Sequence, residues 1–197
     1  MKVLVIGANG HVGSAAVDAL ESRHEVVGVG RSTEPAVDAT DPGSIERLFE
    51  QVGEVDAVIT AIGSVPFRPL AELTREDYAA GFAGKVLSQL DVVRIGTPYI
   101  RERGSITLTT GILAREPIAT GAAAAMANGA IEAFVMAAAA ELPRGIRINA
   151  VSPTVLEEAE GYHDAFPGFV PVRAELVGQA FRKSVEGIQT GRIFAVE

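Results

Sequence analysis

Short apolar runs rich in β-branched residues alternate with helix-length segments along the whole chain. Several of these runs, such as 3–6 and 57–60, are continuously apolar and lack the alternation of a strand with one wet face. Strands buried on both sides, each followed by a crossover helix, are typical of this pattern. It therefore predicts an α/β fold: a Rossmann-type, doubly wound parallel sheet of about seven strands with helices on both faces. We expect the strands at residues 2–6, 25–29, 36–39, 55–60, 105–109, 146–151 and 192–196.

Five helices are expected between these strands. Asp41 followed by Pro42 marks the start of the second helix, because an acidic cap and a proline in the first turn favour helix initiation. No internal repeat, low-complexity tail or linker interrupts residues 1–197, so we expect a single domain. The expected helices cover residues 11–22, 43–51, 75–101 (with room for a break), 121–142 and 174–186.

Charge and cysteine content narrow the function classes. The chain has 17 Lys and Arg against 25 Asp and Glu, a net charge of −8, and no basic stripe. This excludes a nucleic-acid partner, which would need a phosphate-neutralising surface. The absence of cysteine excludes disulfides and thiolate chemistry, and three scattered histidines predict no metal site. A cytoplasmic location fits this composition.

No membrane partner is expected. The first apolar run has only four residues before Gly7, too few for a secretory signal. The one long segment with few charges, 120–140, is mostly alanine and contains Asn128 and Glu132. Insertion of such a segment into hydrocarbon would be costly, so it indicates a helix buried in the protein or in an interface.

A glycine-rich turn joins the first strand to the first helix. It reads Gly7-Ala-Asn-Gly-His-Val-Gly13. Glycines let the backbone approach a pyrophosphate, and the free amides at a helix N-terminus attract its charge. The alternative is a tight strand-to-helix turn with no binding role, but the position after a first strand favours dinucleotide binding. The residues expected to contact the cofactor here are Gly7, Asn9, Gly10, His11, Val12 and Gly13.

The end of the second strand distinguishes the two nicotinamide cofactors. An acidic side chain there would accept hydrogen bonds from a ribose 2′-hydroxyl, but the chain has Gly30, Arg31 and Ser32 instead. A guanidinium and a hydroxyl suit a 2′-phosphate, so NADP(H) is preferred over NAD(H). The alternative is that Arg31 is an ordinary solvated surface cation.

Several further motifs, in order, resemble the short-chain dehydrogenase/reductase family over nearly the whole chain. Residues 37–41 resemble the segment whose first aspartate contacts adenine, and residues 59–63 stand where the family has Asn-Asn-Ala-Gly, keeping only the glycine. Residues 104–110 resemble the strand ending in the catalytic serine, and 144–153 the strand and turn closing over the nicotinamide, with Thr154 replacing the usual glycine. The resemblance implies further cofactor contacts from Asp38, Ala39, Ala61, Ile62, Gly63, Thr109, Asn128, Pro153 and Thr154.

The same resemblance shows that the chemistry differs. The family uses a tyrosine and a lysine four residues later, and these positions are Ala124 and Asn128 here. Thr110 replaces the serine, and Lys85 stands where the family has an active-site asparagine. The catalytic residues expected are therefore Thr110, which would hydrogen-bond the substrate oxygen, Lys85 and Asn128, which would hold the ribose.

Lys85 is open to two interpretations. A partly desolvated ammonium could donate a proton to a developing alkoxide. Alternatively, it extends to solvent or pairs with an acid such as Asp77. Tyr162 and His163, in the irregular segment before the last helix, are further candidate proton donors on a lid.

Self-association is also implied by the resemblance. In the family the helices matching 81–101 and 121–142 commonly form a dimer interface, and the small side chains of the second permit close backbone approach. A homo-oligomer is therefore expected.

Two hypotheses for function follow. The first is an NADP(H)-dependent oxidoreductase that acts on a small carbonyl or alcohol substrate with an atypical acid/base group. The second is an NADP(H)-binding sensor or regulatory protein without turnover, since loss of such a group costs about 10²–10⁴-fold in rate.

Overall fold

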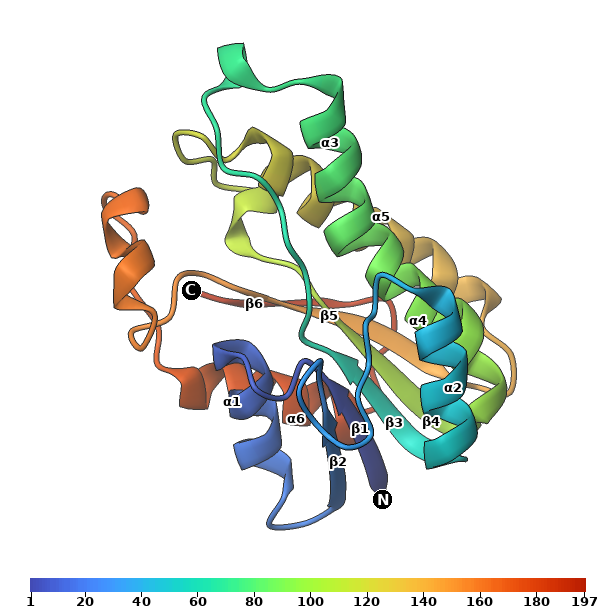
Figure 1. Cartoon of the computed structure of the whole chain (residues 1–197). Helices are drawn as coiled ribbons and strands as arrows, with labels where there is room; N and C mark the ends of the chain where they lie inside the picture. Colours follow the sequence, from blue (N-terminus) through green and yellow to red (C-terminus); the bar gives the residue numbers. More distant parts are fainter.

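The computed structural model describes all 197 residues, and its centre is one parallel sheet in the order β2-β1-β3-β4-β5-β6 (Figure 1). The predicted Rossmann-type fold is confirmed, with six strands instead of seven. The strands are β1 (Lys2–Ile6), β2 (Glu25–Val29), β3 (Val55–Thr60), β4 (Ile100–Thr109), β5 (Arg147–Pro153) and β6 (Ile193–Val196).

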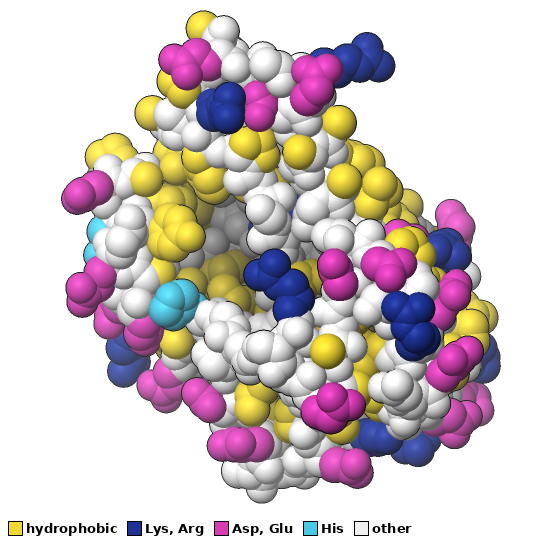
Figure 2. Space-filling view, viewed as in Figure 1, with side chains coloured by type: hydrophobic (Ala, Val, Ile, Leu, Met, Phe, Trp, Pro, Cys, Tyr) yellow, Lys and Arg dark blue, Asp and Glu magenta, His cyan; other side chains and the backbone are white.

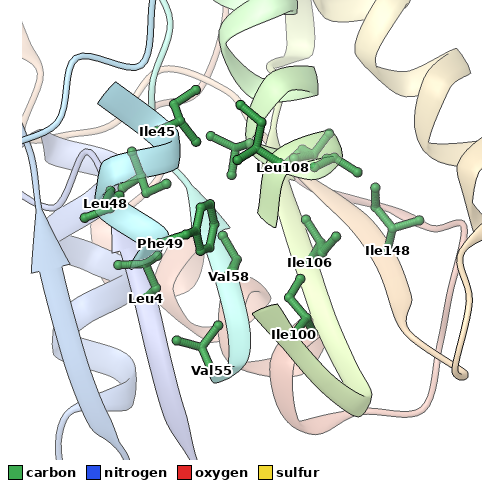
Figure 3. Close-up of a cluster of buried hydrophobic side chains, with 14 of the residues drawn as sticks. Leu4, Ile45, Leu48, Phe49, Val55, Val58, Ile100, Ile106, Leu108 and Ile148 are labelled. Atoms are coloured by element: carbon green, nitrogen blue, oxygen red, sulfur yellow. The ribbon is translucent and has the colours of Figure 1, made fainter. Parts of the chain in front are cut away.

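Helices cover both faces of this sheet. Successive strand residues point to opposite faces, so Leu4 and Ile6 join one apolar cluster while Val3 and Val5 join the other. The first cluster packs beneath α2, α4 and α5 (Figure 3), and the second beneath α1 and α6. The helices are α1 (His11–Leu20), α2 (Pro42–Val52), α3 (Arg75–Gly81), α4 (Ser88–Gly96), α5 (Ala122–Glu141) and α6 (Ala174–Glu186).

Helix α5 is long and apolar enough, with a mean hydropathy of 1.4, to pass the length and composition test for a membrane span. In the structure it lies against the sheet instead. Ala127, Ile131 and Val135 pack from it into the first apolar cluster. The prediction of a helix buried in the protein or in an interface is met on this one face, since 33% of the apolar segment is buried.

The strand expected at residues 36–39 does not form. Only an isolated bridge joins Gly30 to Ala36, with the Val37 amide donating to the Gly30 carbonyl at 2.9 Å. Pro35 brings no amide hydrogen to a ladder. Asp38 accepts hydrogen bonds from the amide and hydroxyl of Thr40, which favours a turn over an extended strand.

The long helix expected at 75–101 is broken into parts. A π-helical turn, Phe82–Leu87, lies between α3 and α4, and a 3-10 turn, Thr97–Tyr99, ends the segment. Pro98 disfavours continuation of the helix through the preceding residue. Strand β4 then starts at Ile100, before the expected position, so the helix ends short of residue 101.

A buried glutamine, Gln89 on α4, joins the carboxyl ends of β3 and β4. Its Oε1 accepts from the Thr60 hydroxyl at 2.6 Å and from the Thr109 amide at 2.9 Å. Its Nε2 donates to the Thr109 carbonyl at 2.9 Å and to the Ile62 carbonyl at 3.3 Å. We call these contacts the Gln89 bridge. They replace strand pairing where the β3–β4 ladder has ended, and they hold the loop after β3.

Gln89→Leu is expected to lower the free energy of unfolding by about 2–4 kcal/mol, because it leaves the buried polar groups of Thr60 and Thr109 unpaired. Chemical denaturation monitored by circular dichroism measures the change. Gln179→Leu, at an exposed position on α6, is the matched control and should stay within about 0.5 kcal/mol of the parent protein. Equal stability of the two variants would contradict a structural role for the bridge.

Candidate cofactor and active site

A cleft of about 520 Å³ opens at the carboxyl edge of the sheet. Figure 2 shows the hollow in this face, with hydrophobic side chains on its walls and a basic side chain at its rim. The chain passes to β2 on one side of β1 and to β3 on the other, and such switch points are where this architecture binds ligands. The expected cofactor residues that line the cleft are Gly7, Asn9, Gly10, Arg31, Ser32, Asp38, Ala39, Ala61, Ile62 and Gly63.

The glycine turn of this cleft has no room for side chains. Gly7 has φ of +91°, and a Cβ there would collide with the Ala61 carbonyl. A Cβ on Gly13 would collide with the Gly7 carbonyl. The backbone of the turn is therefore packed directly against the loop after β3.

The N-terminus of α1 faces this turn without a capping side chain. Gly10 is the cap residue, and no acidic residue occupies the first turn. The amides of His11, Val12 and Gly13 find no acceptor in the protein. Unpaired amides and the positive end of the helix dipole suit a pyrophosphate.

Arg31 and Ser32 lie at the rim, directly after β2. Both are exposed, and Asn9 Nδ2 lies 3.5 Å from the Ser32 hydroxyl. Hydrogen bonds from Thr40, with a smaller contribution from the Arg31 charge, hold the pKa of Asp38 below its usual value. Asp38 is therefore an ionised acceptor on the cleft wall, as a contact with an adenine amino group requires.

Lys85 sits in the π-helical turn with its aliphatic stem over Gly63. A Cβ on Gly63 would lie 2.7 Å from Lys85 Cγ, so this close packing requires a glycine. The side chain is partly buried and has no ion pair or hydrogen bond to the protein. Burial lowers the pKa of Lys85 to about 8. Asp77, the alternative partner, instead caps α3 and lies 3.7 Å from Arg68.

The two threonines at the end of β4 have protein partners. The Thr109 hydroxyl donates to the Thr60 carbonyl at 2.6 Å, beside the Gln89 bridge. The Thr110 hydroxyl is 3.1 Å from Glu132 Oε1 on α5. Thr110 is therefore already engaged on the α5 side of the sheet.

Asn128 and Thr154 carry buried polar atoms without partners. Asn128 is 3% exposed and Thr154 5% exposed, yet Asn128 Oδ1 and Thr154 Oγ1 make no hydrogen bond. The Asn128 amide lies beside Gly111, where a Cβ would be 3.3 Å from Nδ2 and 3.7 Å from the Pro153 carbonyl. Buried polar groups are normally paired, so these atoms indicate that the site is completed by a bound molecule.

Ala124, which the resemblance places at the position of the family tyrosine, is buried in a small apolar cluster. Ile112 and Leu113 share it, and Phe166 and Phe169 pack against it with their rings edge to face at 5.5 Å. This side of the site is therefore apolar. Of the two candidate lid residues, Tyr162 is 58% exposed and a His163 ring nitrogen pairs with the Leu156 carbonyl at 2.9 Å.

These residues fit a nicotinamide dinucleotide. The glycine turn leaves backbone amides open to a pyrophosphate, and the unpartnered atoms of Asn128 and Thr154 stand where the resemblance expects ribose and nicotinamide contacts. These unpartnered atoms support the assignment of Asn128 and Thr154 to the cofactor site independently of the resemblance.

Sequence reasoning missed parts of the cleft and the partner of Thr110. Ser64, Gly84 and Ser88 line the end of the cleft nearest Lys85. Gly84 and Ser88 are four residues apart on one helix, and this spacing is the only sign of them in the sequence. Glu132, which follows Asn128 by four residues on one helix face, is not among the site residues expected from the sequence. The remaining lining residues are Ile6, Gly30, Val37 and Thr40.

The helices expected to mediate self-association carry exposed apolar side chains. Leu87 lies just before α4, and Met126 and Met136 lie on α5. Self-association through them, like the cytoplasmic location, stays a prediction.

Comparison with known proteins agrees with the geometry. The protein lin1944 from Listeria innocua is 49% identical, with a TM-score of 0.98 and full coverage of both chains. A small-chain dehydrogenase solved in complex with NADPH has a TM-score of 0.86 at 24% identity, covering 100% of this chain and 96% of that one, a likeness of fold. Hydroxynaphthalene reductase of Aspergillus fumigatus is 30% identical over 150 residues, or 73% of this chain and 54% of that protein. The chain spans about half the length of this reductase and of two other curated relatives that it matches.

The match to a family model is broader than these pairwise likenesses. The model described as enoyl-(acyl carrier protein) reductase matches residues 3–188. This match covers the sheet from β1 to β5, the cleft and every helix. The chain belongs to the short-chain dehydrogenase/reductase family of oxidoreductases.

Proposed function

We propose that this chain is an NADP(H)-dependent oxidoreductase that interconverts a small carbonyl compound and its alcohol, with Lys85 as the group that exchanges a proton with the substrate oxygen. The observation that carries this proposal is the unpaired cation of Lys85, whose stem covers Gly63 in the cleft wall.

When bound, the nicotinamide nucleotide supplies or accepts the hydride. The free amides at the start of α1 hold the pyrophosphate, and Asp38 accepts from the adenine. Arg31 and Ser32 bind the 2′-phosphate, and the NADPH complex of the small-chain dehydrogenase supports this cofactor. Asn128 holds the nicotinamide ribose through its amide.

Lys85 has the acidity that proton exchange near neutral pH requires. With a pKa of about 8 it is mostly protonated at pH 7, and its proton is far more readily given up than that of an ordinary lysine. The ammonium also stabilises negative charge on the substrate oxygen. The apolar cluster around Ala124 accommodates the hydrocarbon part of the substrate.

A second candidate, nucleotide binding without turnover, is favoured by one observation. The position of the family tyrosine is Ala124, closed into an apolar cluster with no acid beside it. A panel of ketones, aldehydes and quinones with NADPH separates the two functions. Turnover abolished by Lys85→Met supports the enzyme, whereas tight NADPH binding with no turnover supports the sensor.

Gly10→Ala is expected to weaken NADPH binding at least tenfold, because the added methyl group projects from the cap residue into the pyrophosphate site. The nearest protein atom to a Cβ there is 3.6 Å away, so the fold should accept it. Calorimetric titration gives the affinity, and thermal melting tests the fold. Gly13→Ala is the contrast: its Cβ meets the Gly7 carbonyl, so it should lose stability as well. NADPH affinity unchanged in Gly10→Ala would place the pyrophosphate elsewhere.

Arg31→Ala is expected to weaken NADPH binding by about 10–100-fold, the value of charge-assisted hydrogen bonds to a phosphate. NADH affinity should change by less than about threefold, since NADH has no 2′-phosphate. Arg75→Ala, which removes an exposed arginine from α3, controls for the change in net charge. Equal losses of affinity for NADPH and NADH would show that Arg31 does not contact the 2′-phosphate.

Lys85→Met is expected to lower kcat for carbonyl reduction by about 10²-fold or more. In the parent protein, kcat/KM for reduction should be level below pH 8 and fall above it, because the lowered pKa of Lys85 leaves a neutral amine there. For alcohol oxidation, the rate should rise through the same pH.

The matched control for this variant is Lys183→Met. The Lys183 ammonium lies 5.1 Å from the Phe194 ring centroid, on the α6 side of the sheet. The Lys183→Met variant should retain the pH profile of the parent protein. A profile that still breaks near pH 8 in Lys85→Met would assign the proton to another group.

A further inference from the structure

Glu132 binds three donors through a single carboxylate oxygen. Its Oε1 lies 3.1 Å from the Thr110 hydroxyl, 3.3 Å from the Ser152 hydroxyl and 2.9 Å from Arg115 Nη1. The Glu132 side chain is 16% exposed. An ionised carboxylate only accepts hydrogen bonds, so each hydroxyl must direct its hydrogen toward Glu132.

Arg115 keeps this carboxylate in place. Its Nη1 also donates to the Ser152 hydroxyl at 3.2 Å, and its Nη2 donates to Glu197 Oε1 at 2.8 Å. The guanidinium thus lies between two acids and is held by both. These charge-assisted hydrogen bonds fix the position of the Glu132 carboxylate behind Thr110.

The consequence is a fixed polarity at Thr110. A threonine hydroxyl has one hydrogen, and Glu132 takes it. Thr110 Oγ1 then presents only a lone pair to a bound molecule, so it can accept a hydrogen bond from the substrate but cannot donate one to a carbonyl oxygen. This differs from the role that the sequence analysis gave to Thr110.

Asn128 lies on the same side of the site as Thr110. Its Nδ2, a donor, is the atom nearest to a Cβ on Gly111, the residue that follows Thr110, while its unpartnered Oδ1 is buried. The acceptor that the end of β4 offers to a bound molecule is therefore Thr110 Oγ1. The ammonium of Lys85, in the π-helical turn, is available for the carbonyl oxygen.

We propose that the Glu132–Thr110 pair makes the site selective for carbonyl compounds that carry a hydroxyl group on the carbon next to the carbonyl, that is, α-hydroxy ketones or aldehydes. This rests on the proposed function, because the carbonyl oxygen is assigned to Lys85. The substrate hydroxyl donates to Thr110. The apolar residues around Ala124, with Phe166 and Phe169, surround the remainder of the molecule.

Three matched aryl ketones test this selectivity: 2-hydroxy-1-phenylethanone, its methyl ether 2-methoxy-1-phenylethanone, and acetophenone. The ether keeps the oxygen atom but has no hydrogen to donate. Dissociation constants are measured by calorimetry on the protein saturated with NADP⁺, which cannot reduce a ketone. We expect the hydroxy ketone to bind about tenfold more tightly than either of the others.

The variants locate the selectivity. In Glu132→Ala the Thr110 hydroxyl is free to rotate and donate, so the preference for the hydroxy ketone over the ether should fall to within about threefold. Thr110→Val should remove the preference and Thr110→Ser should retain it. Thermal melting of each variant with NADP⁺ separates loss of fold from loss of selectivity, and Thr110→Val remains decisive where Glu132→Ala does not fold.

Equal affinities of the hydroxy ketone and the ether in the parent protein would overturn the proposal, as would a preference that Thr110→Val leaves intact. Failure of the proposed function has a different signature. In that case NADP⁺ does not bind, or Lys85→Met leaves the reduction of 2-hydroxy-1-phenylethanone by NADPH unchanged.

Discussion

The position of the site depends on the Gln89 bridge. Strands β3 and β4 pair along their length, but their ladder stops before the carboxyl ends, where Thr60 and Thr109 still expose backbone and hydroxyl groups to the interior. One buried amide satisfies these groups and reaches the Ile62 carbonyl as well. The loop carrying Ile62 and Gly63 is thereby fixed against α4. Because Gly7 packs on Ala61 and Lys85 on Gly63, both the pyrophosphate turn and the candidate proton donor are placed by contact with that loop.

The close packing of this edge explains why glycines occupy it and why the cleft is open. At Gly7, Gly13 and Gly63 a Cβ would overlap backbone or the Lys85 stem, so the backbone surfaces meet without side chains between them. The resulting concave surface has unpaired amides on the α1 side, and the unpaired cation of Lys85 lies behind Gly63 in the π-helical turn. Neither is compensated within the protein, since α1 has no acid in its first turn and Asp77 is engaged at the start of α3. Negative charge from a bound molecule would stabilise both.

The sequence predicts the parts of this molecule that depend on local pattern. Apolar runs locate five of the six strands closely, and the glycine turn and Arg31 lie on the cleft wall as expected. The strand predicted at residues 36–39 is wrong. Pro35 and the hydrogen bonds between Asp38 and Thr40 favour a turn there, despite the short run that contains apolar residues. The sequence pattern does not predict the Gln89 bridge or the Glu132–Thr110 contact, because they join residues 20 or more positions apart through side chains. A polar residue on a helix gives no sign from sequence alone that it faces a strand end.

The residues that the resemblance places at the family tyrosine and lysine positions affect the polarity of the site, not only its acidity. Ala124, Asn128 and Glu132 follow one another at intervals of four along α5. Glu132 binds the hydrogen of Thr110, which leaves Thr110 Oγ1 as an acceptor at the end of β4. Lys85, an unpaired donor with a full charge, lies on the π-helical turn, where burial has lowered its pKa. In the proposed function, a bound carbonyl oxygen faces Lys85 and a hydrogen-bond donor of the same molecule faces Thr110. In this proposal the carboxylate behind Thr110 and the Lys85 ammonium together impose one orientation on a substrate, and either charge alone would leave two.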